Sequence, residues 1–254
     1  MKTLKKIALS AAAAAFWLIL WQIASLAVGN PLILPSPIAT LVRLVELSLE
    51  SDFWKAIGSS LLRVVIGIVI AIPFSTLFAW ICSSSKIADA LFSPAVTLMK
   101  SIPVVSFILI AIFLFDRSAI PSAIAFMMVF PVLYGNIREG IASVSREILE
   151  MTKVFRLSML LRLKRIYAPA IAPYFFAAVT ASVGLALKAG IAAEVIAYIP
   201  VSIGKKLSDA KSYMEPADLL AWTAAILVIG LLLEFLLKIT LKRIQRRRDD
   251  VKAD

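Results

Sequence analysis

The residues of this chain that could do chemistry are charged side chains set inside long apolar segments. Lys188 and Glu194 lie in the segment 169–199, which is otherwise uncharged. A charged side chain at such depth is costly against lipid, so we expect it to face a neighbouring helix or a water-filled path. On a path, the lysine would suit an anionic solute. Equally, Lys188 could form a structural ion pair with Glu194 or Glu234, or snorkel to the surface, and the sequence leaves these alternatives open.

Composition excludes most catalytic chemistry. The chain has no histidine and one cysteine, Cys82, which excludes histidine general bases, His/Cys metal sites and intrachain disulfide bonds. No G-x-x-x-x-G-K-[ST] motif occurs, so the chain has no P-loop to hold nucleotide phosphates. We therefore expect no enzymatic activity, no cofactor and no metal. A membrane-embedded enzyme would have only the scattered Glu194 and Glu234 as candidate carboxylates.

A second group of charged residues lies in the basic segment 147–169, E-I-L-E-M-T-K-V-F-R-L-S-M-L-L-R-L-K-R-I-Y-A-P. Its apolar residues recur at helical spacing and form one stripe: Ile148, Met151, Phe155 and Met159. Ser158 is placed to cap a second short helix that leads to Pro169. Such a pair of helices either rests on anionic headgroups or binds a protein partner, and the pattern alone does not decide between the two.

These charged segments must be positioned by membrane helices. The chain is 61% hydrophobic, against roughly 45–50% in soluble domains, and its apolar runs are long enough to cross a hydrocarbon core about 30 Å thick. We predict an all-α integral membrane protein, because a single span must satisfy its backbone hydrogen bonds internally. Residues 1–254 are expected to form one domain. The six predicted spans are 7–28, 57–82, 90–115, 119–137, 169–199 and 218–239, with the loop 138–168 between the fourth and the fifth.

The distribution of basic residues predicts the orientation. With both termini in the cytoplasm, roughly three basic residues lie inside for each one outside. The loop 138–168 is then cytoplasmic, and the net charge of +11 reflects topology and lipid headgroups rather than nucleic acid. M-K-T-L-K-K at the start is typical of a signal peptide, but the apolar run after it exceeds the usual 7–15 residues, so we expect a retained span.

Further patterns indicate short helices outside the spans and close packing within them. Ser36 followed by Pro37 predicts a helix start after the first span, and a second outer helix is expected within 199–216. A stripe of small residues in the fifth span predicts helix packing and subunit contact; it comprises Ala178, Ser182, Ala186, Ala189, Gly190, Ala193 and Ala197. Arg63 and Lys100 are expected to snorkel from nearby span ends.

The segment 147–169 resembles the coupling loop of ABC-importer permeases. That motif runs Glu-Ala-Ala, three residues, Gly, nine residues, Ile, one residue, Leu-Pro; Glu150, Ile166 and Pro169 match it at full spacing. The departures are Met151, Thr152, Arg156 and Ala168. Other motifs follow the order seen in the nitrate/sulfonate/taurine branch: L-P-S-P at 34–37, L-L-R-V-V-I-G at 61–67, K-S-I-P at 100–103, F-P at 130–131 and A-A-E at 192–194.

The resemblance covers nearly the whole chain and implies a type I importer fold in the bacterial cytoplasmic membrane. It implies two ABC ATPase subunits, a second copy or a related permease, and an extracytoplasmic binding protein that delivers a small, anionic solute. The residues expected to contact the ATPase are Glu147, Glu150, Met151, Phe155, Arg156, Ser158, Met159, Ile166 and Pro169. Phe155 and Met159 would be apolar anchors, while Glu150 would fix the register. Lys188 and Glu194 are expected on the translocation path.

Two points remain open at this stage. A secondary transporter, which needs no ATPase, is the alternative function, although the inverted repeats or interrupted helices of that class are not evident. Arg156 stands where the family motif has glycine, and if that position requires a positive φ, an arginine there costs on the order of 1 kcal/mol. The solute, and the pairing of like or unlike permeases, are not encoded in a recognisable motif.

Overall fold

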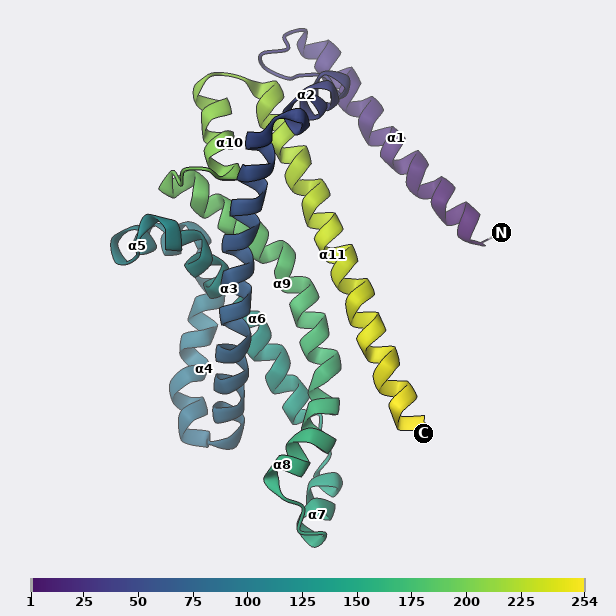
Figure 1. Cartoon of the computed structure of the whole chain (residues 1–254), viewed down its shortest axis with the longest axis vertical. Helices are drawn as coiled ribbons and strands as arrows, with labels where there is room; N and C mark the ends of the chain where they lie inside the picture. The colour runs from purple at the N-terminus through teal and green to yellow at the C-terminus, as the bar shows by residue number, and fades with distance from the viewer. Residues whose placement is uncertain (1, 254) are drawn as a thin grey trace.

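The computed structural model describes residues 2–253 and the side chains of 8–9 and 11–240, and the described residues contain helices and no strand. Figure 1 shows an elongated helical bundle, with α2 and α10 near one end and α7 and α8 at the other. The elements are α1 (Lys2–Val28), α2 (Pro37–Leu49), α3 (Ser51–Ser84), α4 (Lys86–Ser101), α5 (Val104–Leu114), a 3₁₀ turn (Arg117–Ala119), α6 (Ile120–Ala142), α7 (Arg146–Val154), α8 (Met159–Arg162), a π-helical turn (Leu163–Tyr167), α9 (Ala168–Ala197), α10 (Ile203–Ser212) and α11 (Pro216–Ala253).

Helices α3, α6 and α9 form the centre of the bundle, and small residues let them approach closely. A Cβ at Gly67 of α3 would lie 2.4 Å from the carbonyl oxygen of Ser122 in α6, so only glycine fits there. A Cβ at Gly190 of α9 would lie 2.7 Å from the Val64 side chain of α3. The predicted small-residue stripe of α9 is therefore buried inside this chain, which accounts for its composition without contact between subunits.

The segment predicted as one span at 90–115 is two helices. Among the described residues, five stretches are long and apolar enough to span a membrane, and the pair α4 and α5 makes up to six if it counts as one span bent by 108°. The bend falls at Ile102–Pro103, because proline has no N–H to continue the helix and its ring forces the preceding residue into an extended conformation. Lys100 therefore lies in the last turn of α4, beside this break.

The short helices predicted outside the spans are present at one end of the molecule (Figure 1). Ser36 caps α2 by accepting a hydrogen bond from the Ala39 N–H at 3.1 Å, and Pro37 occupies the first turn. Arg43 of α2 donates to both carboxylate oxygens of Asp218 in α11, at 2.5 and 2.9 Å. This pair raises the pKa of the guanidinium above its usual value and fixes α2 to the start of α11.

Helix α1 stands apart from the bundle. None of its apolar window 11–28 is buried, and it diverges from α11 in Figure 1. Its described polar contacts are with the following loop, where Trp21 Nε1 donates to the Pro35 carbonyl at 3.1 Å and Ser25 Oγ donates to Leu34 at 2.9 Å. The bundle that positions the candidate site therefore consists of the helices from α3 onwards.

Candidate functional site

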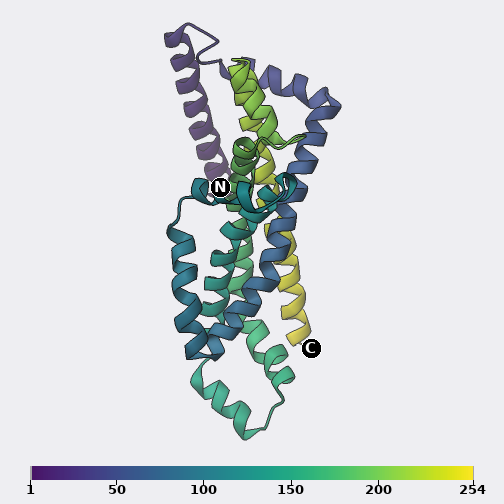
Figure 2. The ribbon, with the colours of Figure 1, turned by 90° about the vertical axis from the view of Figure 1, so that its left-hand side faces the viewer.

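The loop between α6 and α9 forms two short helices beyond the end of the bundle, as Figure 2 shows at the bottom of the view. Ser145 caps α7 by accepting from the Ile148 N–H at 3.4 Å. The Glu147 carboxylate accepts from its own backbone N–H and from the Ser145 hydroxyl, which lowers its pKa below the usual value. Buried Thr152 donates to the Leu149 carbonyl at 2.7 Å. Local hydrogen bonds thus define α7 where few tertiary contacts are available.

The turn after α7 has the conformation that favours glycine, and Arg156 adopts it with φ 48°. The Arg156 N–H donates to Lys153 at 3.1 Å, and the Leu157 N–H donates to Thr152 at 3.0 Å. These two bonds are the Schellman arrangement, in which the residue after the cap is left-handed. The turn is therefore built as the glycine-containing motif would build it, and arginine carries the backbone strain.

The second half of the loop continues without a break into a long membrane helix. Ser158 caps α8 as predicted, accepting from the Leu161 N–H at 3.3 Å. Helical backbone then runs over 39 residues from Met159 to Ala197. Its π-turn forms where Pro169 cannot donate to the preceding turn, and the Ala168 N–H bonds to Leu163 instead. The helix α8 is thus joined to α9 by continuous helical backbone.

Most of the predicted contact residues of this loop are exposed, and the apolar ones among them form an exposed apolar surface. Phe155 is 70% exposed, and Met151 and Met159 are each 47% exposed. Glu147, Glu150, Arg156 and Ser158 are exposed as well, whereas Ile166 and Pro169 are half-buried where the loop joins α9. Val154, at 79% exposure, extends the surface and was missed. Its spacing of three residues from Met151 on the same helix is the signal that could have found it.

Glu194 lies at a fully enclosed junction of three helices. Its side chain is 1% exposed; one carboxylate oxygen accepts from the Ser60 hydroxyl of α3 at 2.7 Å and from the Gly204 N–H of α10 at 3.2 Å. The other accepts from Arg63 of α3 at 3.2 Å. Arg63 therefore turns inward to pair with Glu194, and the prediction that it snorkels to the surface is wrong.

Lys188 has a different environment from Glu194, and the two do not meet. Glu194 is paired with Arg63, and Glu234 pairs with Lys238 at 3.4 Å. Lys188 is exposed and forms no ion pair within the described part of the chain. The ion pairs considered for this lysine are therefore absent among residues whose side chains are described.

Lys100 is a second lysine of this kind, which the sequence interpretation assigned to a span end. It is exposed, and its Nζ lies 3.5 Å from the place where a Cβ of Gly135 in α6 would be. No ion pair of Lys100 occurs among the described side chains. Nor does that part of the chain contain a group of three Cys, Asp or Glu residues that could hold a metal.

The sequence of this chain is similar to those of known membrane transport proteins. The profile of the family "Binding-protein-dependent transport system inner membrane component" matches residues 64–250. A bicarbonate transport system permease protein of Synechococcus elongatus is 28% identical over 231 residues, which cover 86% of this chain and 82% of that protein. A nitrate import permease protein of Synechocystis is 28% identical, over 90% of this chain and 86% of its own length.

Two further similarities agree with these. A putative aliphatic sulfonates transport permease protein of Bacillus subtilis is 22% identical, over 91% of this chain and 84% of that protein. Among solved structures, a chain of the inward-facing MetNI methionine ABC transporter superposes with a TM-score of 0.56 and 16% identity, covering 76% of this chain and 93% of that one. The structural similarity concerns the fold, which is that of a type I importer permease.

Proposed function

The chain belongs to the binding-protein-dependent transport system inner membrane components and is a permease subunit of an ABC importer; from that premise we propose that it conducts a small anion and is driven through its α7–α8 segment. The family is one of multi-pass inner membrane transport proteins that work with an ATPase and a binding protein. A secondary transporter, the alternative considered from the sequence, is thereby set aside.

The observation that carries the coupling proposal is the continuity of α8 with α9. Met159 begins the continuous helical stretch that becomes the membrane helix α9, and Phe155 lies in the turn just before it. Both side chains are exposed. A rigid helical connection transmits displacement, whereas a flexible loop would absorb it. In the proposed complex, Phe155 inserts into a groove of the ATPase, and Glu150 sets the register by pairing with a basic or N–H group.

The charge distribution supports an anionic solute. Lys188 and Lys100 are exposed on the described chain and have no carboxylate partner there. An unpaired lysine at membrane depth is tolerated where it faces water or a partner, and a broken span such as α4–α5 is tolerated under the same condition. We assign both lysines to the path. The named cargoes of three relatives, bicarbonate, nitrate and aliphatic sulfonates, are anions.

The contacts of Glu194 favour a structural role over a place on the path. All three of its hydrogen-bond partners come from this chain, and its side chain is 1% exposed. The proposed assembly has the whole chain as one transmembrane domain, a second permease copy or a related permease, and two ATPase subunits. Both termini and the loop 138–168 face the cytoplasm, as the basic residues indicate.

Purification of the permease with its ATPase tests the coupling proposal. Phe155→Ala should remove an anchor contributing roughly 2 kcal/mol or more, which corresponds to about thirtyfold weaker retention of the ATPase subunit. Glu150→Ala should also reduce retention, because it leaves a charged partner group unpaired. Leu49→Ala is the matched control, since Leu49 is also a strongly exposed apolar residue, on α2 at the opposite end of the molecule.

The alternatives predict different results. If the segment merely rests on anionic lipid, Glu150→Ala removes a negative charge and leaves ATPase retention unchanged or membrane association stronger. Wild-type retention and wild-type transport in both Phe155→Ala and Glu150→Ala would therefore refute the coupling role. All variants lie outside the spans, so normal insertion into the membrane is the internal control for each.

A further inference from the structure

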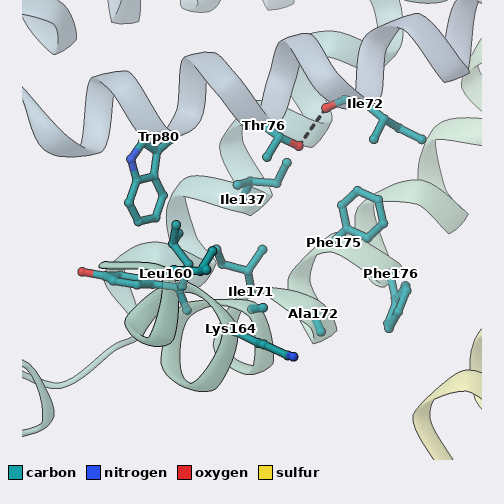
Figure 3. Close-up of a pocket in the computed structure, with 13 residues that line it drawn as sticks. Ile72, Thr76, Trp80, Ile137, Leu160, Lys164, Ile171, Ala172, Phe175 and Phe176 are labelled. Carbon is teal, nitrogen blue, oxygen red and sulfur yellow. Dashed lines mark hydrogen bonds between the residues drawn. The ribbon is translucent and has the colours of Figure 1, made fainter. Parts of the chain in front are cut away.

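An apolar groove opens on the side of the bundle just above the α8 joint. It encloses about 680 Å³ between α3, α6 and the stretch from α8 into α9. Ile72, Thr76 and Trp80 of α3 face Ile171, Ala172 and Phe175 of α9 across it, as Figure 3 shows. The one polar group of Thr76 is already satisfied, because its hydroxyl donates to the Ile72 carbonyl at 2.8 Å. The interior therefore offers an occupant only apolar contact.

One end of the groove has a different chemical character. Trp80 and Tyr167 meet edge to face there, with ring centroids 4.9 Å apart. Lys164 also lines the groove, from the π-turn, and Figure 3 shows its side chain pointing toward the side of Ala172, away from Trp80. Arg162 and Arg165 lie two residues before and one residue after it. None of the three basic residues has an ion pair with the described side chains, and the buried Nε of Arg162 has no hydrogen-bond partner there.

We propose that this groove binds one anionic phospholipid, with an acyl chain along the α3–α9 wall and the headgroup phosphate at Lys164. The lining matches such a ligand, since an apolar wall that suits an acyl chain lies beside a lysine with no ion pair among the described side chains. The proposal goes beyond the transport function and requires only that the chain spans a membrane.

Charge distinguishes this occupant from a second copy of the chain. The positive charge of Lys164 on the groove lining attracts a phosphate, whereas the same basic stretch of another copy would be repelled. The floor of the groove is the π-turn that joins α8 to α9, so a bound lipid braces this joint against Trp80 of α3. The site is thus a specific position beside a moving element, distinct from the general lipid contact of the bundle surface.

Native mass spectrometry of the purified full chain tests the proposal, using permease extracted in mild detergent and incubated with equal amounts of phosphatidylglycerol and phosphatidylcholine. Ala172→Phe fills the groove, and Lys164→Gln removes the positive charge that lines it. Ala177→Phe is the control for added volume, because Ala177 is exposed on the same helix and does not line the groove. Lys86→Gln is the control for charge at the same end of the bundle.

Wild type should retain one phosphatidylglycerol per chain, and Ala172→Phe should lose it. Lys164→Gln should bind lipid with an anionic preference about fivefold smaller, as expected for the loss of one basic residue. Both controls should behave as wild type. A photoreactive residue at position 172 should form an adduct with lipid. Equal lipid retention in all variants, or an adduct with a second protein chain, would overturn the proposal.

Discussion

At the α2–α10 end of the molecule several charged side chains form ion pairs within the chain, whereas in the α7–α8 segment none does among the described side chains. Arg43 pairs with Asp218, Arg63 with Glu194 and Lys205 with Asp209. The charged residues of the segment form no ion pair with described side chains; they are Arg146, Glu147, Glu150, Lys153, Arg156, Arg162, Lys164 and Arg165. Both regions are rich in charge, so the difference lies in whether the chain supplies its own partners.

This comparison distinguishes ion pairs that hold the fold together from charged side chains that are available to bind another molecule. At the paired end, ion pairs join helices far apart in sequence, such as α2 with α11 and α3 with α9. In the segment, exposed apolar side chains accompany the unpaired charges, and caps and turns supply most of the local order. A substitution at the paired end should therefore lower stability, and one in the segment should affect assembly or transport.

The largest effect is expected at Glu194. Glu194→Ala leaves the partly buried Arg63 without its carboxylate partner, and breaking a buried pair typically costs about 3–5 kcal/mol of stability. Thermal unfolding of the purified permease measures the loss. Glu234→Ala is the matched control, because its pair with Lys238 is largely exposed and should contribute about 1 kcal/mol or less.

A double variant distinguishes the structural role from one on the path. The double variant Arg63→Leu with Glu194→Met removes both charges, so it should be less destabilising than Glu194→Ala alone. If Glu194→Ala keeps wild-type stability and assembly but abolishes transport, the carboxylate belongs on the path and the comparison between the two ends fails.

The next effect concerns the lysines that are unpaired at membrane depth. Lys188→Gln and Lys100→Gln should each lower transport of an anionic solute by roughly tenfold to a hundredfold, since a hydrogen bond to a charged group contributes about 1.5–3 kcal/mol. Stability and retention of the ATPase should not change. Lys→Arg variants at both positions should recover part of the activity, and Lys238→Gln is the control, because Lys238 of α11 pairs with Glu234.

Loss of assembly in either glutamine variant would show that the lysine holds subunits together. Equal transport by Lys188→Gln and wild type would place this lysine away from the solute. The two lysines can be tested separately because they lie on different helices, α4 and α9.

Local sequence patterns predicted local structure well. Ser36 and Ser158 are found as helix caps, because the signal for a cap is contained in a few adjacent residues. The match of Glu150, Ile166 and Pro169 at fixed spacing identified the segment that the structure shows as α7, α8 and the π-turn. The fold class and the membership of the family followed from the order of such motifs along the chain.

Contacts between distant segments could not be predicted in the same way. The pairing of Arg63 with Glu194 depends on how α3 and α9 pack, and nothing in either segment alone specifies the partner. The proline that causes the break at Pro103 is visible in the sequence. The apolar run continues on both sides of it, so a single span was predicted from hydropathy. The small-residue stripe of α9 correctly predicted close packing, although its partners are helices of the same chain.

The smallest expected effect is at Arg156, where the segment itself carries strain. Its φ of 48° is costly for a residue with a Cβ, so Arg156→Gly should stabilise the α7 turn by up to about 1 kcal/mol. Slower amide exchange at Leu157, whose N–H closes the turn, would measure the gain.

Strain of this kind persists where function requires it, so the Arg156→Gly variant should also hold the ATPase less tightly. Arg156→Asn tolerates the left-handed conformation and lacks the charge, so it should weaken retention equally. If both variants hold the ATPase as tightly as wild type, the arginine makes no contact across the interface, and the unpaired charge at this position of the segment has another cause.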